Sequence, residues 1–208
     1  EDLRRTEYYR SEAERKVEAR KFEDVEQYLH TLGIEAVVGP VRAEDIPRVA
    51  QLTQKTNQFN LTTRRYSVAD IEGLAAAAES AVMTLEVKDR FGDMGLTGVL
   101  IAHGDGEEAV IDSLLLSCRI LGRRLEYAFV DYCLGLLEGR WEVARWRACY
   151  LPTRKNGQVA DFWEMFGFSA ERDGEGRKDY AVDPASRVVH QLPYIHINTQ
   201  GEGLGGTD

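Results

Sequence analysis

Residues 109–124 have the sequence AVIDSLLLSCRILGRR, and this stretch decides the fold. Its first ten residues are a nearly continuous apolar run, which is typical of a central strand buried on both faces of a sheet. An amphipathic helix follows, marked by apolar residues at helical spacing from Leu125 to Leu136. A buried strand that leads into a helix predicts an α/β domain whose sheet is centred on this strand.

On the N-terminal side, two apolar patterns predict the neighbours of this strand. Residues 81–88 alternate in character, and residues 96–103 follow after a glycine-bearing turn, so we predict an antiparallel hairpin. Three further elements precede it: a strand over 36–41, a helix over 44–56, and a helix over 67–78 that a capping box at Ser67 and Asp70 opens.

The two ends of the chain complete the predicted organisation. After the central helix we predict a strand over 143–151, a helix over 159–166 and two short strands over 168–172 and 179–183. Residues 1–33 form two helices, of which the first is solvated and the second ends at Gly33. We therefore divide the chain into a helical linker or extension over 1–33, a folded domain over 34–200 and a disordered, glycine-rich tail over 201–208.

Composition narrows the function classes. The 208 residues carry 26 basic and 35 acidic side chains, a net charge of −9, which argues against duplex nucleic acid or an anionic membrane as the main partner. No apolar run approaches the roughly 18 residues that a membrane span needs. The three cysteines lack CxxC spacing, so we expect a cytoplasmic protein with neither a disulfide framework nor a metal site.

The turn after the central strand is the first candidate for a binding site. Gly122 lets the backbone approach a ligand, and the N–H groups at the start of the following helix can bind a diphosphate. Three arginines flank this turn and join Gly122 as candidate cofactor-binding residues: Arg119, Arg123 and Arg124. The alternative is an ordinary turn whose arginines are solvated.

The order of these elements resembles the GNAT acyltransferase fold. Arg119 and Gly122 match the first two anchors of that family's Arg-x-x-Gly-x-Gly/Ala loop, although Arg124 stands where the family prefers Gly or Ala. Residues 156–168 are similar in spacing to the family's Asn…Tyr-Glu-Lys-Leu-Gly-Phe segment, and the likeness adds Asn156 to the cofactor-binding residues. It implies a mixed, mostly antiparallel sheet flanked by helices, with CoA or a phosphopantetheine arm as cofactor.

Trp163 replaces the tyrosine of that segment. A phenol can protonate a departing thiolate, whereas an indole N–H is far too weak an acid, so ordinary acetyl transfer is disfavoured. The alternatives are that Trp163 packs in the core and that Asn156 caps a helix.

A more extensive likeness is to the C-terminal half of FkbH-like proteins, and it spans residues 1–197. It is carried by four segments: 52–66, 89–93, 117–123 and 152–157. The likeness implies that an upstream HAD-like phosphatase half takes 1,3-bisphosphoglycerate and that the two halves load a glyceryl unit onto the phosphopantetheine thiol of an acyl carrier protein in polyketide biosynthesis. Residues 1–33 would then connect the halves, since the HAD Asp-x-Asp motif is absent here.

Three residues are candidates for the chemistry. Cys118 follows the buried strand beside Arg119, surroundings that favour a thiolate, so we hypothesise that it holds the glyceryl group as a thioester. Asp112 and His196 are candidate bases for the incoming thiol. The alternatives are an inert buried cysteine, a structural carboxylate and a surface histidine.

The polar loop over 57–66 supplies candidate substrate-binding residues. Amides and hydroxyls suit a small hydroxylated acyl group, and an arginine suits a carboxylate or phosphate. The residues are Asn57, Asn60, Thr62 and Arg64, and the alternative is a loop that caps itself.

Three functions remain open from the sequence. The first is an acyl (glyceryl) transferase that acts on an acyl carrier protein, whose acidic surface would meet the local arginines. The second is a non-catalytic docking module for that carrier, and the third is a CoA-dependent N-acyltransferase.

Overall fold

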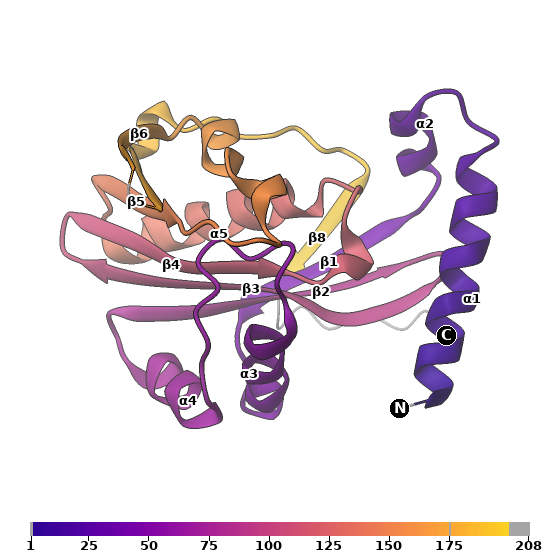
Figure 1. The fold of residues 1–208 in the computed structure, drawn as a ribbon, viewed down its shortest axis with the longest axis horizontal. Coiled ribbons are helices and arrows are strands. Elements are labelled where there is room, and N and C mark those ends of the chain that lie inside the picture. The colour runs from indigo at the N-terminus through magenta and orange to yellow at the C-terminus, as the bar shows by residue number, and fades with distance from the viewer. Residues whose placement is uncertain (1, 175, 200–208) are drawn as a thin grey trace.

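The computed structural model describes residues 2–174 and 176–199, and the predicted disordered tail lies outside them. The described strands form one eight-stranded sheet in the order β6-β7-β5-β4-β3-β2-β1-β8 (Figure 1). Their bounds are β1 Ile34–Pro40, β2 Ser80–Asp89, β3 Gly92–Asp105, β4 Glu108–Leu116, β5 Arg145–Tyr150, β6 Ser169–Gly174, β7 Arg177–Val182 and β8 Ile195–Thr199. The predicted central strand is β4, with four described strands on one side of it and three on the other.

The sheet is mixed and mostly antiparallel, as predicted. The pairs β1–β8 and β4–β5 are parallel, and the other neighbouring pairs are antiparallel. The parallel pair β4–β5 needs a crossover, which α5 (Leu125–Trp141) supplies. The edge strand β8 was not predicted from the sequence.

Helices cover the two faces of the sheet unequally (Figure 1). The helix α5 packs on one face in the larger core, which includes Phe129 and Trp146. The helices α3 (Ile46–Lys55) and α4 (Val68–Ala76) pack on the opposite face against β2 and β3. On that second face, beyond β4, the side chains of Arg145, Arg147 and Glu171 form ion pairs that are partly exposed to solvent.

The capping box at the start of α4 is present as predicted. Ser67 Oγ accepts a hydrogen bond from Asp70 N at 3.2 Å, and the Asp70 carboxylate accepts one from Ser67 N at 2.7 Å. These bonds satisfy N–H groups that the first turn of a helix leaves without partners.

We expect Ser67→Ala to lower the free energy of unfolding by about 1 kcal/mol, because the alanine cannot accept the bond from the helix N–H. Urea denaturation measures this, with Ser67→Thr as the matched variant that keeps the hydroxyl. Equal loss in both variants would contradict a capping role for the side chain.

One predicted helix is wrong. The segment over 159–166 forms two short 3-10 turns, η3 (Gly157–Val159) and η4 (Phe162–Phe166). The apolar residues are nevertheless buried at the predicted positions, and Gly167 ends the second turn with φ +81°. A Cβ at Gly167 would lie 3.0 Å from the Ser186 carbonyl oxygen, so the chain turns where a side chain would crowd a neighbouring segment.

The N-terminal helices are α1 (Asp2–Ala19) and α2 (Val25–His30), and α1 is not simply solvated. Arg15 is buried and donates two hydrogen bonds to the Asp89 carboxylate of β2, at 2.9 and 2.8 Å. Arg123 lies 3.6 Å from the same carboxylate. A buried, bidentate ion pair between Arg15 and Asp89 therefore joins the N-terminal extension to the sheet.

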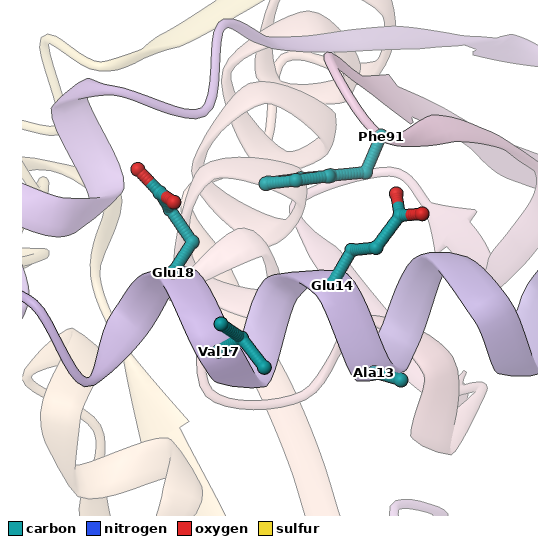
Figure 2. Close-up of a pocket in the computed structure, with 5 residues that line it drawn as sticks. All are labelled: Ala13, Glu14, Val17, Glu18 and Phe91. Atoms are coloured by element: carbon teal, nitrogen blue, oxygen red, sulfur yellow. The ribbon is translucent and has the colours of Figure 1, made fainter.

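A shallow hollow of about 450 Å³ lies beside α1 and is lined by Ala13, Glu14, Val17, Glu18 and Phe91. Figure 2 shows Glu14 and Glu18 rising from α1 toward the ring of Phe91. Glu14 pairs with Arg10 and Glu18 pairs with Arg90, so both carboxylates are already engaged. The lining of this hollow includes no cysteine, serine or histidine.

Candidate active site

The candidate site begins where β4 and β5 part. The two strands pair directly over Glu108–Ile111 and Arg145–Ala148. Beyond that point the loop residues Phe59 and Leu61 take over as partners of β4: Leu61 N donates to Leu114 O at 3.1 Å, and Leu116 N donates to Phe59 O at 3.0 Å. The predicted polar loop thus runs through the gap between the two strands.

The loop also bonds to the other side of the gap. Leu151 N donates to Leu61 O at 2.8 Å, and the Asn156 side chain donates to Asn60 O at 2.9 Å. Both bonds hold the loop from the β5 side. The next loop residues, including Thr62 and Arg64, are thereby placed beside β4.

Asp112 occupies a β-bulge in β4. Ile101 of β3 faces Ser113 and Ala102 faces Ile111, so Asp112 is an extra residue without a partner across the ladder. A bulge redirects a side chain out of the regular alternation of a strand. The Asp112 side chain is 7% exposed, so the carboxylate is buried and must be paired.

Three side chains provide that pairing. Arg64 forms an ion pair with Asp112, and the Tyr66 hydroxyl donates a hydrogen bond to Oδ2. Ser113 Oγ donates to the same oxygen at 3.0 Å and lies 3.1 Å from Thr62 Oγ1. Two loop residues, Arg64 and Tyr66, therefore bind this carboxylate of the central strand directly, and Thr62 contacts Ser113 beside it.

A cavity of about 350 Å³ opens beside this carboxylate, within the range of small-molecule pockets. Its lining includes Asp112 and Ile111 of β4, Ala148 and Cys149 of β5, and Arg64 of the loop. Arg147 of β5 also lines it, and the neighbouring β6 and β7 supply five further polar residues: Glu171, Arg172, Arg177, Asp179 and Tyr180.

Among the groups that line this cavity, the Cys149 thiol and the Tyr180 phenol both have a raised pKa. Burial raises the pKa of the Cys149 thiol, and the positive charges of Arg177 and Arg64 partly oppose that shift. Burial also raises the pKa of Tyr180 to about 12, so its phenol stays protonated at neutral pH.

The turn after β4 forms an open N-terminal end of α5. Cys118 is exposed on the short turn η2 (Cys118–Ile120), and Arg119 N donates to Ser117 Oγ at 3.4 Å. Gly122 has φ +82° with open space around it, and Arg124 precedes α5 without capping it through its side chain. The first N–H groups of α5 and their dipole favour an anion here.

Arg123 corrects the prediction for this turn. Its side chain is 8% exposed and points away from the open end, toward Met94 Sδ at 2.8 Å and Asp89 at 3.6 Å. The neighbouring Arg124 takes the left-handed conformation, φ +59°, which sets the two arginine side chains apart. Arg123 also lies 3.7 Å from Glu12 of α1, so it joins α1 to the sheet rather than facing a ligand.

The prediction that His196 acts as a base is not supported by its position. It lies on β8, the edge strand beyond β1, where it faces Glu35 across the parallel register. Three strands, β1, β2 and β3, separate β8 from β4. His196 therefore does not reach the Asp112 cavity.

Asn156 has a structural position rather than a binding one. It is fully buried, its oxygen accepts hydrogen bonds from Thr153 N and Oγ1 at 2.7 and 2.9 Å, and its amide donates to Asn60 O and Leu151 O. It does not cap the following turn with its side chain. All of its polar side-chain atoms are used within the protein, so it offers none to a cofactor.

The four residues predicted to bind substrate in the polar loop differ in how far their side chains are buried. Asn60 is fully buried, and its side chain bonds to Thr56 O and Thr63 N. Asn57 donates to Lys55 O and accepts a hydrogen bond from Arg65. Thr62 is buried against Ser113, whereas Arg64 is 44% exposed and lines the cavity. Of the four, Arg64 is placed to touch a ligand.

Trp163 packs in the core, as its alternative interpretation held. It is 1% exposed, and its indole N–H donates to Cys149 O at 3.3 Å.

Within the described ranges, no three or more His, Cys, Asp or Glu side chains gather in a way that would hold a metal ion. Among the same residues, no helix has the length and apolar character to cross a bilayer.

Cys149 was not among the site residues predicted from the sequence. The sequence feature that could have indicated it is the alternation of β5, in which Arg145, Arg147 and Cys149 share one face and Trp146 and Ala148 share the other. That pattern predicts a polar face on β5. It does not predict that this face meets Asp112.

No protein-family model matches this chain, and no curated protein matches it in sequence. Solved structures do match. An acetyltransferase from Thermus thermophilus has a TM-score of 0.54 at 18% identity, with 73% of this chain and 99% of that chain covered. The GNAT domain of S. lividans PAT has a TM-score of 0.55 at 14% identity, covering 70% and 89%.

A third match is Rv2747 from Mycobacterium tuberculosis, solved in complex with CoA and NLQ, with a TM-score of 0.54 at 13% identity over 70% of this chain and 98% of that one. At these identities the likeness shows the fold alone. The fold is the GNAT fold, as predicted.

Proposed function

Given a GNAT-fold domain, we propose that this chain is an acyltransferase that exchanges a glyceryl group with the phosphopantetheine thiol of an acyl carrier protein, through a cysteine thioester. The observation that carries the proposal is the buried Asp112 carboxylate, held at a bulge of the central strand and open to a polar cavity. The FkbH-like sequence segments supply the substrate class and an upstream HAD-like half.

The proposed reaction, thioester exchange, has a small free-energy change. Thioester exchange conserves the bond type, so the site needs a group that handles the proton of the thiol and donors that stabilise the oxyanion. Asp112, which lines the cavity, is the group that we assign to the first task. Arg64 and Arg177 line the cavity with guanidinium donors for the second.

The open N-terminal end of α5 suits the phosphate of the carrier's arm. Its N–H groups and Gly122 leave room for an anion, and Arg124 is exposed beside them. The exposed Arg154 and Lys155 extend the basic surface, which complements an acidic carrier despite the net negative charge of the chain. Cys118 is exposed at the same turn and is a candidate for the thiol that first meets the arm.

The test is exchange between two carriers. The chain is mixed with a glyceryl-loaded carrier protein and an unloaded carrier of different mass, and intact mass spectrometry follows movement of the glyceryl group. We expect the chain to accelerate this movement well above the rate without it. Carrier binding without exchange would leave a docking module, and turnover of acetyl-CoA with an amine would instead indicate an N-acyltransferase.

A further inference from the structure

Arg123 lies in a turn whose backbone needs support from neighbouring contacts. It stands between Gly122, with φ +82°, and Arg124, with φ +59°, directly before α5. A left-handed conformation costs free energy for a residue with a side chain, so it persists only where the surroundings hold it. The side chain of Arg123 supplies contacts of that kind.

The Arg123 guanidinium belongs to a buried cluster of opposite charges. Its Nη1 is 3.6 Å from Asp89 Oδ2 and 2.8 Å from Met94 Sδ, and its Nη2 is 3.7 Å from Glu12 Oε2. Arg15 donates two hydrogen bonds to the same Asp89 carboxylate and lies 3.6 Å from the same Glu12 oxygen. The side chains of Arg123, Arg15 and Asp89 are at most 8% exposed, so water screens these attractions little.

The four charged members come from three separate parts of the chain. Glu12 and Arg15 belong to α1, Asp89 ends β2, and Arg123 belongs to the turn between β4 and α5. Glu12 Oε2 is buried and accepts no hydrogen bond from a described residue, so the two nearby guanidinium groups balance its charge. If α1 leaves the sheet, Arg123 loses Glu12, and its pair with Asp89 opens to water, where an ion pair contributes little.

Contacts outside the cluster also hold α1 in place. Ser11 Oγ donates a hydrogen bond to Phe91 O, in the turn between β2 and β3, at 2.8 Å. The Tyr28 hydroxyl donates one to Arg15 O at 3.2 Å. Because these contacts position α1, a substitution of Glu12 can weaken the cluster without releasing the helix.

We propose that Arg123 is a positioning residue that couples the docking of α1 to binding of the carrier's phosphopantetheine arm at the turn over 117–124. The inference rests on the proposed function and deepens it, since it names what controls the arm-binding turn. Arg123 acts through the backbone of its two neighbours, which leads into the first N–H groups of α5. Coupling between two sites is reciprocal, so binding of the arm in turn stabilises the docked α1.

Carrier proteins with and without the arm isolate this effect. The holo form carries phosphopantetheine and the apo form lacks it, so the ratio of their Kd values, measured by isothermal titration calorimetry, reports the contribution of the arm. Arg123→Met keeps a long side chain but removes the charge. We expect it to raise the Kd for the holo carrier about 5–50-fold, within the usual range of coupling between sites, and to leave the Kd for the apo carrier unchanged.

Glu12→Gln tests the same coupling from α1, and its side chain is 30% exposed. We expect this variant to raise the Kd for the holo carrier about threefold. The double variant should bind as Arg123→Met alone does, whereas two independent structural defects would add. Arg10→Gln is the matched control on α1, where an exposed pair with Glu14 is lost and no change in Kd is expected. Thermal unfolding checks that each variant is folded at the temperature of the titration.

Hydrogen exchange of the α1 amides tests the reciprocal effect in the wild-type chain. We expect saturation with holo carrier to slow exchange across α1 and saturation with apo carrier to leave it unchanged. In Arg123→Met the slowing should disappear. A purely structural role of Arg123 does not predict this response to the arm.

Failure of this inference is distinguishable from failure of the proposed function. If the wild-type chain binds holo carrier no better than apo carrier, it has no arm site and the proposed function fails. If folded Arg123→Met keeps the preference for holo carrier, or loses affinity for both carriers equally, the coupling is overturned and the proposed function survives. Unchanged exchange of α1 in the wild-type chain with holo carrier also overturns the coupling. Should Arg123→Met not fold, Glu12→Gln and the wild-type exchange data decide the question.

Discussion

Replacing Asp112 with Asn is expected to lower glyceryl exchange by about 10²–10⁴-fold, the usual effect of losing a positioned acid–base group. The amide keeps the shape of the carboxylate but cannot accept the thiol proton. Arg64 would lose its ion-pair partner, but its side chain is 44% exposed, so water can solvate the guanidinium. The main effect therefore falls on the rate and not on folding, and initial exchange rates and thermal unfolding measure the two separately.

The matched control for Asp112→Asn is Asp161→Asn. Asp161 pairs with Lys178 at 2.9 Å, and its side chain is 67% exposed, outside the cavity lining. We expect exchange by this variant to stay within about twofold of the wild type, because solvated ion pairs contribute little. A folded Asp112→Asn chain with normal exchange would show that the carboxylate serves structure alone.

The second large effect is on stability. We expect Arg15→Leu or Asp89→Asn to lower the free energy of unfolding by about 3–5 kcal/mol, because each leaves a buried group without its charged partner. In the native chain the Arg15 and Asp89 side chains are 4% and 0% exposed. The Asp89 carboxylate also accepts a hydrogen bond from Phe91 N at 2.9 Å, and the amide oxygen of an asparagine can still accept it. Asp89→Asn therefore removes mainly the charge.

Urea denaturation of the whole chain measures this effect, and Arg10→Gln is the matched control on the same helix. Arg10 pairs with Glu14 at 3.2 Å, but its side chain is 83% exposed, so we expect a change below about 0.5 kcal/mol. Equal, small changes in all three variants would mean that α1 contributes little to the folded domain. A large change confined to Arg15 and Asp89 would make the extension an integral part of it.

Local patterns in the sequence predicted most of the fold. Period-two alternation and an apolar run marked β2, β3 and β4, and a capping box marked the start of α4, because both signals depend on neighbours along the chain. The edge strand β8 escaped prediction because its partner β1 lies far away in sequence. The helix expected over 159–166 failed for a related reason, since apolar spacing shows which residues are buried and not how tightly the chain turns.

The candidate site was predictable in part. Asp112 and Arg64 stood out by residue type, but their contact depends on a loop that crosses between β4 and β5. Arg123 was misjudged because it is adjacent to Gly122 in sequence, while its side chain pairs with a carboxylate of another strand.

The sequence by itself determined the periodic elements, their order and the resemblance to an acyltransferase fold. The tertiary structure decided which side chains share the cavity, above all that Arg64 of the loop pairs there with Asp112 of β4. The physical reason is that strand register and loop path are set by packing and hydrogen bonds between segments distant in the chain, and no local pattern contains them.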